Sequence, residues 1–301
     1  MRLISHKGDS NILHIFDMLW IKQQEVHMKI TYFGTASSES WPALFCNCKA
    51  CRLARELGGK NVRTRSQTLI GESLLIDFPP DTNYHVQKMG LDLKKVTSLF
   101  ITHSHHDHFF PYDICMRNSA FAEEIENFRL SVYGNEAVKN KFYEAAKIFF
   151  GVDDFIEFHQ IEPFDQVRTE DAYQVTALEA DHNQPEKSLI YIIEQNGQSI
   201  LYAHDTGIFP ERTWKFLEGK YFEFVSLDCT ALSRDWRSGH MGFRAVDLVK
   251  ERMEDMGCID SNTILVLNHF AHFQDYTHDK ICKAVENKRY YVAYDGCQFV
   301  F

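Results

Sequence analysis

One short segment restricts the fold more than any other part of the sequence, because four metal-binding side chains follow directly after an apolar run. Residues 96–102 have the composition of a buried strand, and the next six residues are His103-Ser104-His105-His106-Asp107-His108. Imidazole and carboxylate are natural ligands of Zn, Mn and Fe. A tight loop can turn His103 and His105 towards one ion. Asp107 and His108 can then serve a second ion, so we expect two metals at the end of this strand.

Three more residues of ligand type stand where other strand-like runs end. His182 follows the run 175–180, Asp205 follows 200–202, and His269 follows 264–267. Sheet proteins assemble their sites at strand ends, so these side chains are expected to join the first cluster.

The order His-x-His-x-Asp-His, a lone His, an Asp and a last His resembles the metallo-β-lactamase superfamily, over nearly all of residues 29–301. The resemblance implies the α/β (α+β) class and a four-layer αββα sandwich. It further implies the ligand sets: one metal is held by His103, His105 and His182, the second by Asp107, His108 and His269, and Asp205 bridges both. An oxygen-reducing di-iron role fits poorly, because Glu would then be expected in place of His105.

Other polar residues near these ligands have weaker claims. His106 occupies the variable place inside the motif, and strand alternation directs His204 away from the face of Asp205. Asp77 ends the run 73–76 and either orients a ligand imidazole or caps a turn.

Cysteines form a second constellation, Cys46-x-Cys48-x-x-Cys51, among eight in the chain. A closed structural zinc site needs four ligands, so the fourth must come from elsewhere. His272 stands three residues after His269, and the same loop can therefore close both sites. The alternative is three unrelated cysteines.

This cysteine cluster after Gly34-Thr35 resembles the branch of the superfamily that contains the phosphodiesterase of carbon–phosphorus lyase pathways. In that branch three Cys and one His hold a zinc ion. A protein of pyrroloquinoline quinone biosynthesis carries a similar cluster. His240 lies in a Gly-flanked loop and resembles the non-ligand catalytic His of the phosphodiesterase branch. It is our candidate for protonating the leaving group. Asp107 is the second residue that we predict to be catalytic. Ser37-Ser38-Glu39 departs from the glycine-rich pattern expected there.

The expected cofactors are two catalytic divalent ions, Zn or Mn before Fe, and one structural Zn. A hydroxide bridging the two catalytic ions would attack phosphorus in a small or cyclic phosphate ester. Two alternatives stay open: a carboxyl-ester, lactone or thioester hydrolase using the same metals, and a non-catalytic accessory protein of cofactor biosynthesis. The complete ligand set disfavours the second.

Charge narrows the choice of partners. The formal net charge is −10, whereas proteins that hold long nucleic acids usually present a basic face. We therefore expect a small-molecule substrate, no long nucleic acid and no membrane partner. The oligomeric state is open, with a homodimer as one alternative. The N-terminus lacks the pattern of a secretory signal, and we expect a cytoplasmic, reduced protein.

The pattern of apolar runs predicts many strands with helices between them, including helices over residues 113–127, 136–149, 210–217, 242–256 and 277–287. Asn196-Gly197 predicts a tight hairpin. Because no Pro/Gly/Ser-rich linker interrupts the chain, we expect one hydrolase domain over residues 29–301, preceded by an N-terminal extension over residues 1–28.

Overall fold

The computed structural model describes residues 27–126 and 128–301, and in this part of the chain the strands form two seven-stranded sheets. The first sheet has the order β14 (Gln298–Val300), β1 (Lys29–Gly34), β2 (Gln67–Ile70), β3 (Leu74–Ile76), β4 (Ser98–Phe100), β5 (Leu130–Gly134) and β6 (Ile156–Gln160). The second has the order β13 (Tyr290–Val292), β12 (Ile264–Asn268), β11 (Phe224–Asp228), β10 (Gln198–Ala203), β9 (Leu189–Gln195), β8 (Gln174–Glu179) and β7 (Gln166–Arg168).

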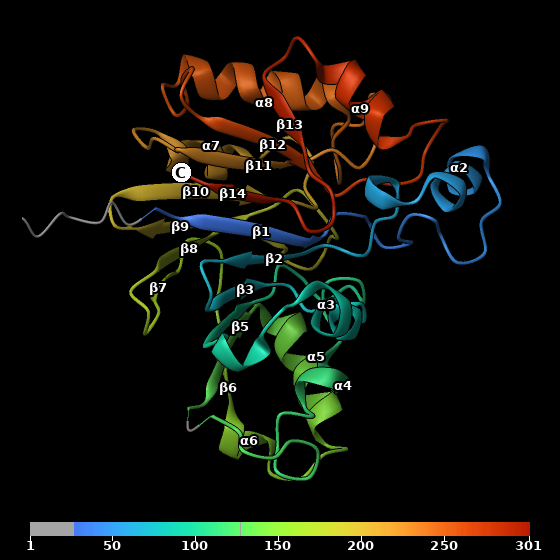
Figure 1. The fold of residues 1–301 in the computed structure, drawn as a ribbon. Helices are drawn as coiled ribbons and strands as arrows, with labels where there is room; N and C mark the ends of the chain where they lie inside the picture. Colours follow the sequence, from blue (N-terminus) through green and yellow to red (C-terminus); the bar gives the residue numbers. More distant parts are fainter. Residues whose placement is uncertain (1–26, 127) are drawn as a thin grey trace, which may run out of the picture.

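The helices are α2 (Lys49–Leu57), α3 (Thr82–Met89), α4 (Pro111–Ile114), α5 (Glu136–Ala146), α6 (Val152–Phe155), α7 (Glu211–Leu217), α8 (Phe243–Asp255) and α9 (His278–Val285), with short 3-10 turns at Gly59–Asn61 and Leu93–Lys95. Figure 1 shows the two sheets stacked between two helical layers. Helices α3, α4 and α5 lie on one side, and α7, α8 and α9 lie on the other. The predicted αββα sandwich is thus confirmed.

The central strands are largely apolar because both of their faces are buried. Along β10, Ile200 and Tyr202 pack into the core between the sheets. Leu201 and Ala203 point the opposite way, into the core beneath α7, α8 and α9. Successive side chains of a strand alternate between faces, so a strand between two apolar layers is apolar at most of its positions.

Parallel pairing brings several strand ends to one edge. In the first sheet β3, β4, β5 and β6 run parallel, and in the second β10, β11, β12 and β13 do. The carboxyl ends of parallel strands meet at the same edge, and the ligand-type residues follow these ends. The fold therefore gathers side chains that are far apart in the sequence.

The helix predicted over residues 113–127 is wrong: α4 ends at Ile114, and an irregular segment follows. Asn118 breaks the pattern, since its side chain donates to Cys115 O at 2.6 Å and accepts from Ala120 N at 2.9 Å. Such local bonds from Asn compete with helix formation. The hairpin at Asn196-Gly197 joins β9 to β10 as expected.

The predicted extension over residues 1–28 lies mostly outside the described residues, and the domain division stays a prediction. Met28 is described and is buried, and it exchanges two backbone hydrogen bonds of 3.1 Å with Phe301. Among the residues described, no helix is long and apolar enough to cross a membrane.

Candidate metal centre

The loop after β4 and the loop after β8 bring together the first set of predicted ligands. His103 Nε2 lies 2.9 Å from His105 Nδ1, and His182 Nε2 lies 3.4 Å from the same atom. One ligand atom from each residue fits within a 4.8 Å span. Three imidazole nitrogens converging in this way form one face of a metal site.

The second set comes from both sheets. Asp107, His108, Asp205 and His269 offer ligand atoms within 4.8 Å of one another, and all four side chains are buried. Asp205 Oδ2 lies 2.7 Å from His108 Nε2 and 3.4 Å from His103 Nε2, so this carboxylate faces both sets. The structure therefore assembles all seven residues predicted as ligands, although their role as ligands stays a prediction.

The donor atoms fit divalent cations. Asp205 Oδ1 is buried and accepts no hydrogen bond of good geometry, although His240 Nδ1 lies 3.1 Å from it. His108 Nε2 and His269 Nε2 face each other at 3.3 Å. Two imidazole nitrogens and an unsatisfied carboxylate oxygen in one buried place need a cation or protons between them. Their chemistry is that of a Zn, Mn or Fe site.

Electrostatics keep the Asp205 carboxylate ionised. Burial opposes the negative charge of Asp205, but His269 and His108 outweigh it and hold its pKa well below the usual value. Burial likewise opposes the positive charge of His108, yet Asp77, Asp107 and Asp205 raise its pKa well above the usual value. At neutral pH Asp205 is thus available as an anionic ligand.

An unusual backbone conformation at the strand ends directs three of these side chains towards the site. Asp77, Asp205 and His269 have φ angles of 64°, 49° and 62°, in the left-handed region that residues other than Gly seldom adopt. Such strained positions cluster at functional sites, where the surrounding structure holds them.

A buried carboxylate orients His108. Asp77 Oδ2 lies 2.7 Å from His108 Nδ1, and Asp77 Oδ1 accepts from Thr102 N at 2.8 Å. Ligand histidines commonly bond to a carboxylate through the second ring nitrogen. Of the two alternatives for Asp77, the geometry is that of the orienting carboxylate.

Sequence reasoning missed the groups that hold His269. Thr230 Oγ1 lies 2.8 Å from His269 Nδ1 and donates to Asp228 Oδ2 at 2.8 Å. Asp228 is the last residue of β11, as Asp205 follows β10, so the strand-end rule applied to Asp205 could also have found it.

Sequence reasoning also missed the groups that hold Ser104, which stands between two predicted ligands. Glu186 accepts from Ser104 N at 2.8 Å and from Ser104 Oγ at 2.7 Å, and Lys141 donates to Ser104 O at 2.6 Å. Glu186 also accepts from Asn135 and Asn183. The ligand loop, the α5 N-terminus and the loop after His182 therefore share one hydrogen-bonded carboxylate. No local signal in the sequence marks Glu186.

His240 lies at the inner wall of a cavity of about 300 Å³. Its Nδ1 is 3.1 Å from Asp205 Oδ1 and 3.3 Å from Asp228 Oδ2. Burial opposes its protonation, but these two carboxylates raise its pKa to about 11. The cavity is lined by Ser37, Ser38, Glu39, His105, Asp107, His182, Asp205, Thr230, Trp236, His240, His269, Ala271 and Phe273.

The other candidates lie outside the ligand sets. His106 is exposed, and His204 is buried with Nε2 2.7 Å from Ser226 Oγ. Two arginines precede His240 in the same loop: Arg237 pairs with Asp235 at the surface, and the Arg234 guanidinium lies 3.9 Å from the ring centre of Phe273. Neither arginine reaches the predicted ligands through a described contact.

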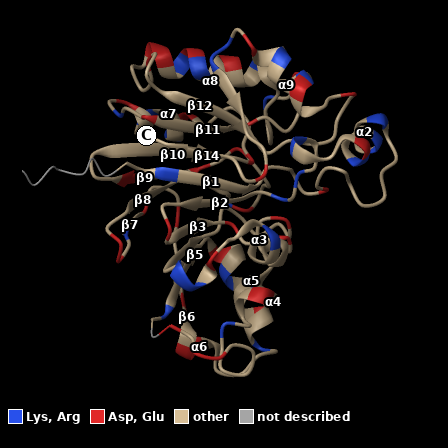
Figure 2. Ribbon diagram, viewed as in Figure 1, with Lys and Arg blue, Asp and Glu red and all other residues tan. Residues whose placement is uncertain are grey.

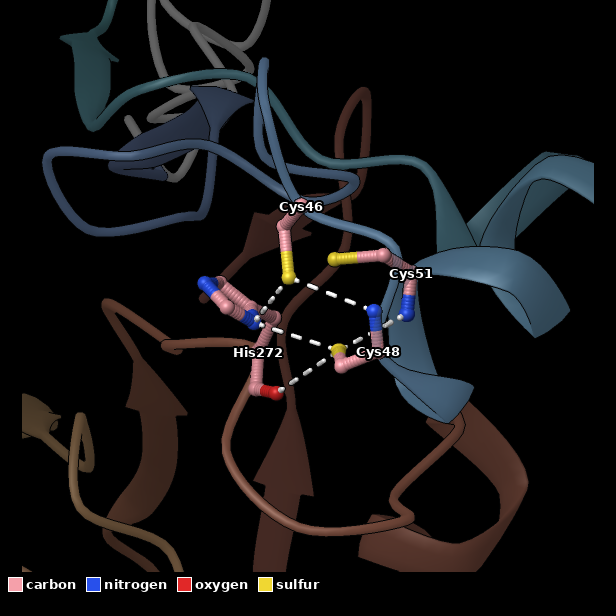
Figure 3. Close-up of side chains that lie close together, drawn as sticks. All are labelled: Cys46, Cys48, Cys51 and His272. Carbon is pink, nitrogen blue, oxygen red and sulfur yellow. Dashed lines mark hydrogen bonds between the residues drawn. The ribbon is translucent and has the colours of Figure 1, made fainter.

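Figure 3 shows the predicted cysteine cluster with His272 turned towards its sulfurs. His272 Nδ1 lies 3.5 Å from Cys48 Sγ and 3.8 Å from Cys46 Sγ, and the four ligand atoms fit within 4.8 Å. Backbone N–H groups point at all three sulfurs: Cys48 N at Cys46, Cys51 N at Cys48, and Ala43 N at Cys51, each at 3.4 Å.

These N–H groups favour negative sulfur. The backbone N–H of Cys48 lowers the pKa of Cys46, whereas burial raises the pKa of Cys51 to about 12. A zinc ion would displace the Cys51 proton. Three sulfurs and one imidazole nitrogen fit a closed structural zinc site.

The family model described as Beta-lactamase superfamily domain matches residues 73–270, well over half of the chain. The protein belongs to this family, and the resemblance inferred from its ligand motif is confirmed. The assignment to the metal-dependent hydrolases of the superfamily is thereby confirmed at the level of family and fold.

Individual relatives share only a low sequence identity with this protein. Ribonuclease Z of Lactococcus lactis subsp. lactis is 26% identical over 156 residues, which cover 52% of this chain and 47% of that protein. The chain spans about half the length of the curated relatives it matches. A crystal structure of a diphosphatase from the PhnP family has a TM-score of 0.70 at 19% identity, covering 91% of this chain and 97% of that one. Zn²⁺-bound PqqB from Methylobacterium extorquens has a TM-score of 0.69 at 15% identity, covering 90% and 99%. These two structures share the fold.

Proposed function

We propose that this protein is a binuclear metal-dependent phosphodiesterase that hydrolyses a small or cyclic phosphate ester. One observation carries the proposal: the carboxylate of Asp205 faces both ligand sets and also contacts His240, a group able to supply a proton. Two Zn or Mn ions in these sets, or less readily Fe, would supply an activated water and neutralise charge on the phosphate.

The chain's own contribution begins with positioning. Asp77 fixes the ring of His108, and Thr230 contacts Nδ1 of His269, so neither imidazole needs to reorganise when substrate arrives. Asp107, 3.2 Å from His108 Nε2, adds negative charge to the second set. Carboxylates and imidazoles already in place avoid a reorganisation cost during reaction.

His240 is the proposed proton donor. Asp205 and Asp228 lie beside its Nδ1, which holds the ring in its charged form and leaves Nε2, on the opposite edge, for the substrate. A protonated imidazole lining the cavity can give its proton to the departing alkoxide. Asp228 acts through His240 and does not reach the substrate.

Size and charge favour a small substrate. The cavity of about 300 Å³ suits a small phosphodiester. Figure 2 shows Lys and Arg interspersed with Asp and Glu over the described ribbon, and the net charge is −10. Although the curated relatives include ribonucleases Z, this balance favours a small substrate over long RNA. We propose that residues 29–301 form the single catalytic domain, with a structural zinc at the cysteine cluster.

The test compares reaction classes on one preparation. Protein purified without chelator and supplemented with Mn²⁺ or Zn²⁺ is assayed with bis(p-nitrophenyl) phosphate, a 2′,3′-cyclic nucleotide, p-nitrophenyl acetate and a thioester. We expect turnover of the phosphodiesters, with about two catalytic metals and one zinc at the cysteines per chain. Background rates with both phosphodiesters, together with turnover of the carboxyl ester or thioester, would move the assignment to acyl hydrolysis.

A matched variant guards against a contaminating enzyme. Asp205→Asn and wild type are purified in parallel, and activity must disappear with this substitution if the metal centre is responsible. Glu211→Gln serves as the surface control, because Glu211 pairs with Arg252 far from the ligands and is 80% exposed.

A further inference from the structure

Glu39 stands at the boundary between the two predicted metal sites. Its side chain lines the cavity shared with His105, Asp107 and His269. Its Oε1 also lies 3.5 Å from Nε2 of His272, the histidine of the cysteine cluster. One carboxylate therefore touches the ligand shell of one site and the substrate space of the other.

Two serines hold the other oxygen of the Glu39 carboxylate, Oε2. Ser37 Oγ donates to Glu39 Oε2 at 2.7 Å, and Ser38 Oγ donates to the same oxygen at 3.3 Å. Ser37 is itself tied to the segment after β12, because its N–H donates to Phe270 O at 3.1 Å. The Ser-Ser-Glu sequence that departs from the glycine-rich expectation thus forms a held wall of the cavity.

His272 can orient Glu39 because its two ring nitrogens face different partners. Nδ1 is directed at Cys48 and Cys46 (Figure 3). Nε2, the other ring nitrogen, lies towards Glu39. A metal-bound histidine commonly donates its other N–H to a carboxylate, and this fixes the ring and its partner together. Zinc at the cysteines would therefore also set the position of Glu39.

The charge of Glu39 decides what it can contact. A carboxylate repels the phosphate group, so its favourable partner is a hydrogen-bond donor on the alcohol part of the substrate. The Glu39 side chain is 30% exposed, and Phe273 and Trp236 line the same cavity. This wall of the cavity thus combines one fixed hydrogen-bond acceptor, the Glu39 carboxylate, with the aromatic side chains of Phe273 and Trp236.

We propose that Glu39 is a specificity-determining residue that selects phosphodiesters whose alcohol carries a free hydroxyl, and that His272 with the cysteine cluster positions it. This inference rests on the proposed phosphodiesterase function. The structural zinc then has a part in substrate choice as well as in holding the fold.

The test uses a matched pair of substrates, 2,3-dihydroxypropyl p-nitrophenyl phosphate and propyl p-nitrophenyl phosphate. Wild type is expected to prefer the diol, and Glu39→Gln should lower the ratio of the two kcat/KM values about tenfold, the value of a hydrogen bond to a charged group. His272→Asn should lower the same ratio, while Glu211→Gln should leave it unchanged. Metal analysis checks that Glu39→Gln still holds its zinc.

A binding experiment gives a readout apart from turnover. Calorimetry with glycerol phosphate and propyl phosphate on the metal-loaded protein should give the same preference and the same loss in Glu39→Gln. A ratio that Glu39→Gln leaves within twofold of wild type overturns the proposal. A ratio lowered by Glu39→Gln but not by His272→Asn overturns the part played by the cysteine cluster. If neither ester is hydrolysed by wild type, the phosphodiesterase function fails, and calorimetry still tests Glu39.

Discussion

The two predicted metal sites of this protein are built in opposite ways. The seven-residue centre draws its side chains from loops between residues 103 and 269, and they converge because parallel strands of two sheets end at one edge. The cysteine cluster takes three of its four ligands from one short segment, with Cys46 before α2, Cys48 at its N-cap and Cys51 in its first turn, where backbone N–H groups face the sulfurs.

The first site is thus positioned by the whole fold, and the second by one short segment of the chain. The strand-end centre exists only when both sheets are formed. The buried Asp77 and Thr230 hold two of its predicted ligands, and the half-buried Glu186 holds Ser104 in the ligand loop. The cysteine cluster needs only its own turn and the approach of His272. Substitution of the residues that hold the ligands of the first site should therefore lower mainly metal affinity and turnover. Substitution at the cysteine cluster should lower mainly the stability of the protein.

The largest effect is expected from Asp205→Asn. The amide removes the negative charge that faces both ligand sets, and we expect phosphodiesterase activity to fall on the order of a thousandfold or more. Metal analysis should find fewer than two catalytic metals per chain, with zinc at the cysteines retained. Full activity with both metals in place would contradict the bridging role.

His240→Gln tests the proton donor within the same centre. Loss of general acid catalysis typically costs about 10²- to 10⁴-fold, and we expect a kcat loss in that range with the metal content unchanged. The loss should shrink for a p-nitrophenol leaving group, which needs little protonation. Equal losses for good and poor leaving groups would exclude His240 as the acid.

Glu186→Gln tests whether a distant carboxylate controls only one half of the centre. Because Glu186 holds Ser104 between His103 and His105, we expect the affinity of the first metal to fall about 10- to 100-fold. Titration with Co²⁺, followed by absorption, resolves the two binding steps. Glu162→Gln is the control, since Glu162 and Glu186 both line a second, surface pocket away from the metal centre, and Glu162 pairs with Lys187 instead of Ser104. Weakening of both metals alike would argue for general damage.

Cys51→Ser should sharpen the contrast between the sites. Losing the buried sulfur removes the structural zinc and should lower the thermal midpoint by about 5–10 °C. The two catalytic metals should still bind below that midpoint. Loss of the catalytic metals at 25 °C would mean that the two sites are not separable.

The smallest effect concerns acid stability of the fold without metals. Burial lowers the pKa of His85 to about 4, and its Nδ1 lies 2.6 Å from Gln67 Oε1. An unfolded His titrates near 6.5, so between these values the unfolded chain takes up a proton that the folded chain does not. Stability should therefore be full above pH 6.5 and decline as pH falls towards 4. In chelated protein, His85→Gln should flatten this decline in urea unfolding. An unchanged slope would show that His85 does not carry it.

The pattern of apolar runs predicted strands with helices between them and ligand-type residues at strand ends, and the resemblance of the ligand motif implied the four-layer sandwich. Apolar runs buried on two faces identify strands, and ligand-type residues after such runs share an edge. Glu186 escaped prediction since its partners, Ser104 and Asn135, are brought to it only by the tertiary fold. The overlong helix beginning at Asp113 failed because composition outweighed the local bonds of Asn118.

The segment after β12 serves both sites within five residues. His269 joins the strand-end centre, Ala271 and Phe273 line the cavity, and His272 turns to the cysteines. Inserting or deleting one residue between His269 and His272 would move one of the two histidines away from its ligand set. The length of this segment is thus fixed by both sites at once, whereas the described part of the irregular stretch after α4 holds none of the predicted ligands. Among proteins with this fold and both sites, we expect insertions and deletions in the stretch after α4 and not in the segment after β12.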